Sequence, residues 1–293
     1  MSSLPNGYLN DFEVIPSSTE IADPKKLFDD FLLYKQLVKE LPGKLLSEAY
    51  LPQSTEAGMF PGLFREICSE QSVGLFRKSA DSHSALCTLW KSRITSIAKL
   101  AIGMRCVNVF QGIDSEFMKE LAKQSSDEQL LIKLPDILAK KGIILIYEKA
   151  FPAMKLDGVV FKAFSGNPVI GISFRYSRID YFWFTLMHEL AHIVLHEDRL
   201  ANPIYDDIDT DSHIDFEIAA NRLAGDSFVS RSAWRTCPAK RETGDDIVIR
   251  YAKSHSIHPA IVAGRLQKEM NWFDRYRNIV DSTNTRKLVF GDE

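Results

Sequence analysis

Two histidines four residues apart, with a glutamate directly after the first, carry the most chemical information in this chain. They form the run His188-Glu189-Leu190-Ala191-His192. Because an α-helix repeats every ~3.6 residues, His188 and His192 would share one face and could bind one ion. Glu189 would lie on the next face, where it reaches a zinc-bound water rather than the zinc. This H-E-x-x-H pattern is typical of catalytic zinc sites.

The residues around this pattern are almost all apolar, both at 181–187 and at 193–195. A helix that is apolar on every side is buried in a core. Buried histidine and glutamate side chains need partners, and a metal ion would supply one. The alternative is a core helix that carries two ordinary histidines.

A catalytic zinc usually has three protein ligands, so a third must come from elsewhere. His196 lies eight residues after His188, about 12 Å along a helix, and cannot share its ion. We expect His196 either to support the metal ligands without binding the ion or simply to end the helix, where a cation suits the helix dipole. Asp211, His213 and Asp215 lie in a polar segment without rigid support.

Glu217 is a better candidate for the third ligand. Residues 214–229 predict a second helix, and small residues along it would allow close approach to the first. Asn221, one turn after Glu217, could hold the ring of His188 or His192 through the nitrogen opposite the metal. The alternative is a solvated glutamate near a helix start. The predicted stripe consists of Glu217, Ala220, Asn221, Ala224 and Phe228.

These residues resemble the ligand signature of the ImmA/IrrE family of zinc endopeptidases. His188-Glu189-x-x-His192 is followed by Glu217-x-x-Ala220-Asn221, a pattern that also occurs in related zincins. Further segments are similar to those that flank the motif in this family, at 157–161, 167–171, 175–178, 182–186 and 257–266. The resemblance spans residues 130–275. Many relatives begin with a helix-turn-helix module, and we recognise none in this sequence.

The resemblance implies an α+β fold, in which a small twisted β-sheet packs on the H-E-x-x-H helix of a zincin-like domain. It implies one catalytic Zn²⁺ held by His188, His192 and Glu217, with Glu189 as the general base. It also implies narrow-specificity cleavage of a repressor or antitoxin-like regulator encoded nearby, in stress, mobile-element or phage-defence circuits. The competing class is a non-catalytic zincin-fold protein that sequesters a toxin or transcriptional regulator.

Composition favours a cytoplasmic protein. Among 293 residues, 45% are hydrophobic, and the net charge of −3 predicts no polyanionic partner such as DNA. The start of the chain has no basic stretch followed by an apolar one, so we expect no secretory signal and no membrane segment. The cysteines lack paired metal-binding spacing and are expected to be reduced thiols, namely Cys68, Cys87, Cys106 and Cys237.

Four parts are expected along the chain. Residues 1–22 predict a loose arm, and residues 23–127 a mainly helical domain with helices near 26–40, 63–67 and 84–102. Residues 128–280 form the zincin-like domain, and residues 281–293 a tail.

Within the zincin-like part we expect a helix at 130–141 that ends at Gly142, a strand at 143–147, and a hairpin of strands 159–164 and 169–174. An edge of this sheet could bind an extended peptide. The hairpin leads into the zinc helix, with Asp180 as a candidate N-cap. Helices are expected again at 245–253 and 258–270.

Two features of the sequence each allow more than one interpretation. His258 precedes Pro259 at a helix start, so its ring either caps that helix or faces the cleft and stabilises the oxyanion of the reaction. Tyr181 and Arg265 are other possible donors. The acidic segment 197–215 is either a solvated loop or a mobile rim that prefers basic or flexible substrate segments.

Overall fold

Three strands form the central sheet of the computed structural model, which describes residues 82–200 and 211–291 together with scattered helical residues between 25 and 39. The strands are β1 (Ile144–Tyr147), β2 (Gly158–Lys162) and β3 (Pro168–Ile172), in the spatial order β1-β3-β2. β1 runs parallel to β3, and β2 runs antiparallel to it. The predicted strands and the predicted hairpin are therefore confirmed, in a mixed sheet.

The turn of the hairpin is fixed by Asn167 and Gly166. Gly166 adopts a φ of +87°, a conformation that glycine takes without strain. The side-chain amide of Asn167 donates to the carbonyl oxygens of Gly142 and Asn108, at 2.7 and 2.8 Å. This amide ties the turn to the end of the preceding helix and so holds β2 and β3 in register.

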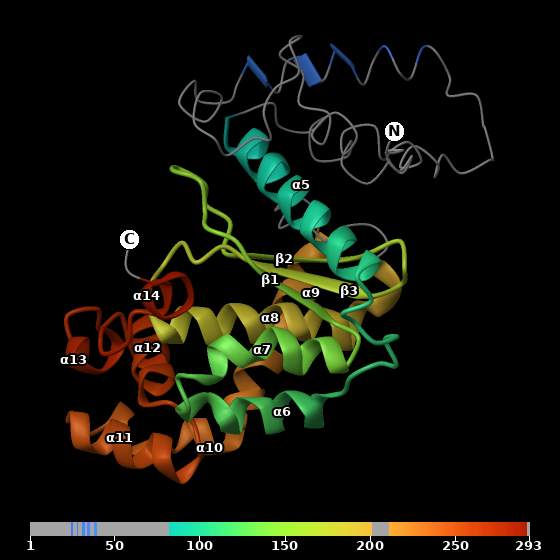
Figure 1. The fold of residues 1–293 in the computed structure, drawn as a ribbon. Helices are drawn as coiled ribbons and strands as arrows, with labels where there is room; N and C mark the ends of the chain where they lie inside the picture. The colour runs from blue at the N-terminus through green and yellow to red at the C-terminus, as the bar shows by residue number, and fades with distance from the viewer. Residues whose placement is uncertain are drawn as a thin grey trace, which may run out of the picture.

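Helices cover both faces of the sheet, as Figure 1 shows. Helix α5 (Ser82–Gly103) lies on one face, where Trp90 and Ile94 are fully buried against strand residues such as Val159. Helix α8 (Ile179–His196) lies on the other face and packs against β2 and β3. Because residues of a strand alternate between faces, Val159 points toward α5 and Val160 toward α8.

The remaining helices surround α8 on the side away from α5 (Figure 1). They are α6 (Ser115–Lys123), α7 (Leu130–Lys140), α9 (Asp211–Phe228), α10 (Arg231–Arg235), α11 (Asp245–Ser254), α12 (Pro259–Met270), α13 (Arg277–Val280) and α14 (Thr285–Phe290). Short 3₁₀ turns occur at Gln124–Ser126, Glu197–Arg199 and Pro238–Lys240. The larger hydrophobic core lies between these helices and the sheet.

The start of α8 differs from expectation, because the prediction of Asp180 as its N-cap is wrong. Arg178 occupies the N-cap position, and Asp180 lies buried in the first turn. The guanidinium of Arg178 donates to both carboxylate oxygens of Asp180, at 2.9 and 2.7 Å, and to Oε1 of Gln267 on α12 at 2.8 Å. These contacts clamp the beginning of α8 to α12.

The N-terminal prediction agrees only in part. The described residues between 25 and 39 are helical, as expected for 26–40. Among them Tyr34 is buried, whereas Phe28 and Leu32 are exposed. The predicted helix at 63–67 lies outside the described residues. The helix predicted at 84–102 is confirmed as α5.

The four-part division of the chain stays a prediction. Helix α6 falls in the predicted N-terminal domain, yet it packs on α9 and α8 and contributes Met118 and Leu121 to the larger core. Helix α14 falls in the predicted tail, where Phe290 packs edge-on against Phe174 at 5.4 Å between ring centroids.

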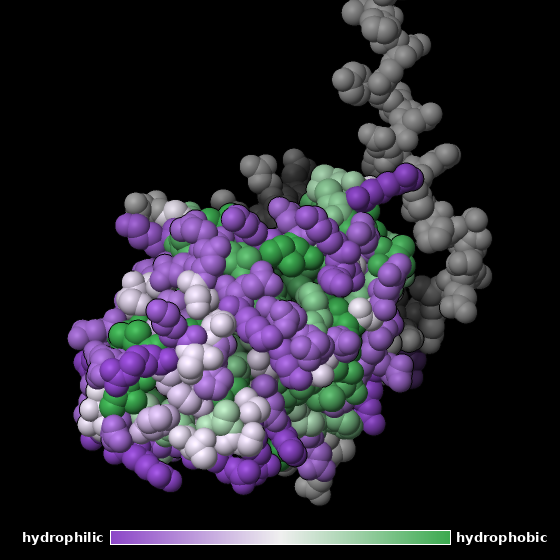
Figure 2. All heavy atoms as spheres, turned by 90° about the horizontal axis from the view of Figure 1, so that it is seen from below, coloured by the Kyte–Doolittle hydropathy of each residue, from purple (hydrophilic) through white to green (hydrophobic). Residues whose placement is uncertain are grey.

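The surface seen from below Figure 1 is largely hydrophilic, with separate hydrophobic areas between the polar side chains (Figure 2). None of the helices in the described ranges is long and apolar enough to cross a lipid bilayer.

Candidate metal centre

Two imidazole rings meet on the middle of α8. His188 and His192 lie one helical turn apart, their ring planes are nearly perpendicular, and their centroids are 4.6 Å apart. The two Nε2 atoms are 3.0 Å from each other. His192 is almost fully buried, and His188 is partly exposed. The helical period therefore brings the two rings together as the sequence pattern predicts.

The third side chain of the cluster comes from α9. Glu217 Oε2 lies 3.0 Å from Nε2 of His188, and Oε1 lies 3.1 Å from Nε2 of His192. Helix α9 can approach α8 closely because Ala220 and Ala224 are small residues buried in the interface. The candidate ligand atoms of His188, His192 and Glu217 all lie within 4.8 Å of one another.

The geometry of these three side chains fits a divalent cation. Donor atoms that surround a zinc ion tetrahedrally at ~2.05 Å lie about 3.3 Å from each other. The separations of 3.0 to 3.1 Å in this cluster are close to that spacing. Oε1 of Glu217 is buried and lacks a well-aligned hydrogen bond, although His192 lies near it. A cation at the centre of the cluster would satisfy this oxygen.

The charge state of Glu217 also suits a ligand. Burial raises the pKa of its carboxyl group, but the adjacent rings of His188 and His192 outweigh burial and hold that pKa well below its usual range. The carboxylate is therefore ionised at neutral pH, as a metal ligand must be.

Glu189 follows His188 in α8 but is not one of the three residues of the cluster. Its side chain is buried, with a relative exposure of 7%, and its carboxylate lies against the first residue of β2. The residue directly after His188 thus faces the edge of the sheet. This position agrees with a base that acts next to the ion without binding it.

His196 supports His192 from the opposite side. The Nδ1 atoms of the two rings lie 3.2 Å apart, so the contact uses the nitrogen of His192 that faces away from the cluster. The ring of His196 also packs edge-on against Phe216, at 4.6 Å between centroids. Burial lowers the pKa of His196, and the neighbouring His192 and Arg199 lower it further, so the neutral ring is favoured.

Asn221 is placed differently from the expectation that it holds a histidine ring. Its side chain is exposed on α9, and the described part of the chain shows no hydrogen bond from it to His188 or His192. Of the two residues proposed to support the ligands, the structure brings His196 to them and leaves Asn221 facing solvent. Asp211 and His213 belong to the first turn of α9, and Asp215 is exposed there.

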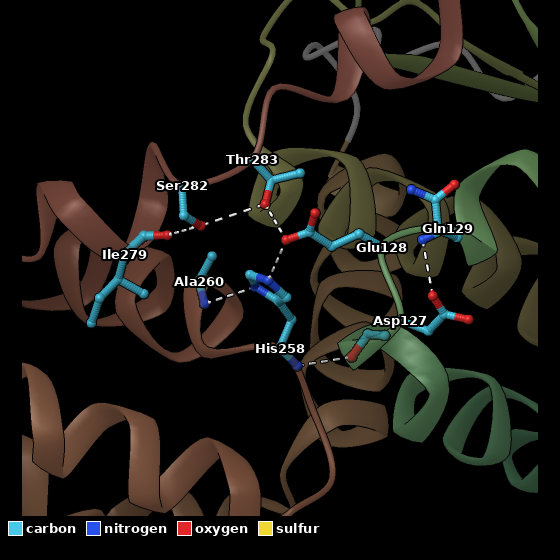
Figure 3. A network of polar contacts seen from close by, with 9 residues as sticks. Asp127, Glu128, Gln129, His258, Ala260, Ile279, Ser282 and Thr283 are labelled. Carbon is cyan, nitrogen blue, oxygen red and sulfur yellow. Dashed lines mark hydrogen bonds and ion pairs between the residues drawn. The ribbon is translucent and has the colours of Figure 1, made fainter.

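His258 forms the N-cap of α12 and the centre of a separate polar network (Figure 3). Its Nδ1 accepts a hydrogen bond from the backbone N–H of Ala260 at 3.1 Å. Its Nε2 lies 3.4 Å from a carboxylate oxygen of Glu128, which also accepts from the Thr283 hydroxyl. The backbone N–H of His258 donates to Ser125 Oγ at 3.1 Å. The structure thus shows the capping arrangement rather than a ring joined to the metal cluster.

Tyr181 and Arg265, the two other residues considered as donors to the oxyanion, also have partners of their own. Tyr181 packs against Tyr176, with ring centroids 4.3 Å apart. Arg265 binds Glu269 at 2.8 Å and lies over the ring of Trp234. Within the described ranges, the structure places neither side chain in the cluster of His188, His192 and Glu217.

The ion pair between Arg178 and Asp180 was not predicted from the sequence. Two oppositely charged residues two positions apart at the start of an apolar helix were an available signal. Their contact with Gln267, 89 positions from Arg178, could not be anticipated from local spacing.

This cluster, on a buried H-E-x-x-H helix beside a small sheet, defines a metallopeptidase of the zincin class. Comparison with protein families agrees, because residues 139–267 match the model of the IrrE N-terminal-like domain, Peptidase_M78. Residues 139–267 therefore carry a metallopeptidase domain similar to those of the ImmA/IrrE family. No curated protein and no solved structure matches the chain.

Proposed function

We propose that the chain is a zinc-dependent endopeptidase of narrow specificity that cleaves a regulatory protein. The observation that carries this proposal is the convergence of two imidazole nitrogens and one carboxylate oxygen within 4.8 Å. Glu189, the residue directly after His188, is buried on the same helix. Three protein ligands would suit a catalytic zinc, which usually keeps a further position open for water or substrate.

The residues of the site have distinct roles in this proposal. His188, His192 and Glu217 hold the ion, and His196 keeps the ring of His192 oriented. A bound zinc lowers the pKa of water and polarises the scissile carbonyl. Glu189 accepts the proton of the attacking water and delivers it to the departing amine. The surrounding core excludes bulk water from this carboxylate.

In this proposal the edge of β2 binds the backbone of the substrate. Ser173 N donates to Asp157 O, and Ala163 N donates to Asn167 O, so odd-numbered residues of β2 bond to β3. The backbone groups of Gly158 and Val160 therefore point away from β3, and Gly158 lies next to the Glu189 carboxylate. At the far end, Lys162 N already donates to Leu200 O at 2.9 Å. An extended peptide could add to the open part of this edge and present its carbonyl to the site.

The substrate class rests on the family. By resemblance to this family, the substrate is a repressor or antitoxin-like regulator encoded nearby. The two proteins would meet in the cytoplasm, and this chain would not contact nucleic acid directly. The net charge of −3 supports a protein substrate rather than a polyanion.

Two measurements test the proposal in sequence. Elemental analysis of the purified protein should find one zinc per chain, and the substitution Glu217→Ala should remove most of it. Proteins encoded beside the gene should then be incubated with the wild type, with Glu189→Gln, and with a chelator. Cleavage by the wild type alone supports the proposal. Tight binding of a regulator without any cleavage by the zinc-loaded wild type would instead favour a sequestering protein.

A further inference from the structure

The carboxylate of Glu189 touches the backbone of β2 at a glycine. A Cβ atom added to Gly158 would lie 2.5 Å from Oε1 of Glu189 and 3.1 Å from its Cδ. It would also lie 2.7 Å from Cγ2 of Thr185, one turn earlier on the same face of α8. Real Cβ atoms do not approach other heavy atoms at 2.5 Å, so a side chain at position 158 requires one of these neighbours to shift. The carboxylate is the nearest of them and stands at the end of a flexible side chain, so it is the group expected to move.

The backbone does not explain this glycine. Gly158 is absent from the residues with positive φ, and it continues the antiparallel pairing with Ile172. A residue with a side chain could therefore adopt its conformation. A glycine inside a strand weakens the strand and often marks a close approach of another group. Here the approaching group is the side chain of Glu189.

We propose that Gly158 is a positioning residue for Glu189: its missing side chain creates the space in which the carboxylate rests at the edge of the sheet. This inference rests on the proposed role of Glu189 as the base. The Cβ of Gly158 would point toward α8, as the side chain of Val160 does, so the space opens directly onto the helix that carries the metal ligands. The backbone of Glu189 is thus held by α8, and its carboxylate is held in place by the edge of β2.

An added methyl group at this position would move the carboxylate without touching the three metal ligands. Glu189 is buried, with a relative exposure of 7%, so the packed atoms around its side chain leave few other rotamers open to it. A misplacement of about 1 Å in an active site can cost on the order of 100-fold in rate. The loss should fall on kcat, because the substrate edge and the ion remain in place.

The first experiment compares Gly158→Ala with Gly171→Ala in the full-length, zinc-loaded protein. Gly171 lies on β3, pairs with Val159, and its added Cβ would meet Trp90 at 2.9 Å instead of Glu189. We expect Gly158→Ala to lower kcat about 10- to 100-fold, with KM changed less than threefold and zinc content unchanged. Gly171→Ala should lower the thermal midpoint while kcat stays within threefold.

The second experiment uses the zinc-free protein and needs no substrate. The shift in Tm caused by Gly158→Ala is measured in the wild type, in Glu189→Ala and in Thr185→Ser. If the carboxylate is the group displaced, the shift should shrink by at least half in the Glu189→Ala background, because neighbouring residues couple in a double-mutant cycle. The Thr185→Ser background lacks the Cγ2 methyl group but keeps Glu189. The Tm shift caused by Gly158→Ala should therefore remain larger there than in the Glu189→Ala background.

Each outcome decides the inference. An unchanged kcat in Gly158→Ala overturns it, as does an equal Tm shift with and without the Glu189 side chain. If Gly158→Ala fails to fold, Gly158→Ala combined with Glu189→Ala should fold, and its failure would also count against the inference. A protein that cleaves no substrate but shows the coupling would refute the proposed function while leaving the contact established.

Discussion

His192 and His196 face each other through their Nδ1 atoms at 3.2 Å, while Nε2 of His192 points to the opposite side, toward His188 and Glu217. One ring is therefore held from behind by another, one helical turn later. This arrangement connects the end of α8 to the candidate metal centre.

Removal of this support should weaken metal binding. We expect His196→Ala to lower zinc affinity about 10- to 100-fold, the usual effect of losing a partner that orients a ligand. Asn221→Ala is the matched control, because Asn221 is exposed, and it should change affinity less than threefold. Titration against a competing chelator measures both. A greater loss in Asn221→Ala than in His196→Ala would restore the sequence-based interpretation of Asn221.

Substitution of the base should separate binding from catalysis. Glu189→Gln should keep zinc but reduce cleavage at least about 1,000-fold, because the amide cannot accept the proton of water. His192→Ala should lose both zinc and activity, since it removes a ligand. Zinc content and cleavage rate are measured on the same preparations. Proteolysis retained by metal-verified Glu189→Gln would end the assignment of this residue.

Zinc removal should destabilise the wild type. A ligand that binds only the folded state at 1,000 times its Kd stabilises it by about 4 kcal/mol. The chelator should therefore lower Tm strongly in the wild type and only weakly in Glu217→Ala, which has lost one ligand. Differential scanning calorimetry with and without chelator gives the comparison. Equal shifts in both proteins would show that the ion binds elsewhere.

The cap of α12 should make stability depend on pH. Burial lowers the pKa of His258 below 6.5, and the bond to Glu128 offsets only part of that effect. The unfolded chain then takes up a proton more readily, so the contribution of His258 is complete above pH 6.5 and is lost as the pH falls below it. His258→Asn keeps an acceptor for Ala260 N–H but does not titrate. Urea unfolding at pH 7.5 and 5.5 should show a smaller loss in His258→Asn than in the wild type.

Packing at the start of α8 gives a prediction on stability alone. A Cβ at Gly264 on α12 would overlap Oδ2 of Asp180, which is buried and paired with Arg178. Gly264→Ala must therefore push apart the two helices or break a buried ion pair, and we expect a loss of about 2–4 kcal/mol in the free energy of unfolding. Gly225→Ala, whose added Cβ would have its nearest neighbour at 3.6 Å, should cost nothing and could add up to about 1 kcal/mol, because alanine is the better helix former.

The ligand residues could be predicted because the helical period alone places His188 and His192 together. Glu217 could be predicted because a long side chain tolerates some error in how α9 is rotated. Asn221 could not, since the buried face of α9 follows Ala220, Ala224 and Phe228. Glu217 and Asn221 stand at the border of that face, where only the longer side chain reaches inward. The exposure of Asn221 depends on helix docking, which local spacing does not determine.

The elements themselves could be predicted closely where apolar periodicity and turn residues agree, as in the hairpin around Gly166 and in α7 before Gly142. Asp180 could not be placed correctly, because N-cap preference favours aspartate whereas a tertiary contact through Arg178 and Gln267 decides its position. The contact between Gly158 and Glu189 is likewise tertiary, and only the unusual strand glycine hints at it.

The division of the ligands between α8 and α9 has a consequence for newly made protein. Two imidazoles on α8 can capture an ion as soon as that helix forms, but the carboxylate of Glu217 arrives only when α9 docks. Full metal affinity therefore requires the assembled interior. We therefore expect proteolytic activity to appear only after α9 has docked on α8.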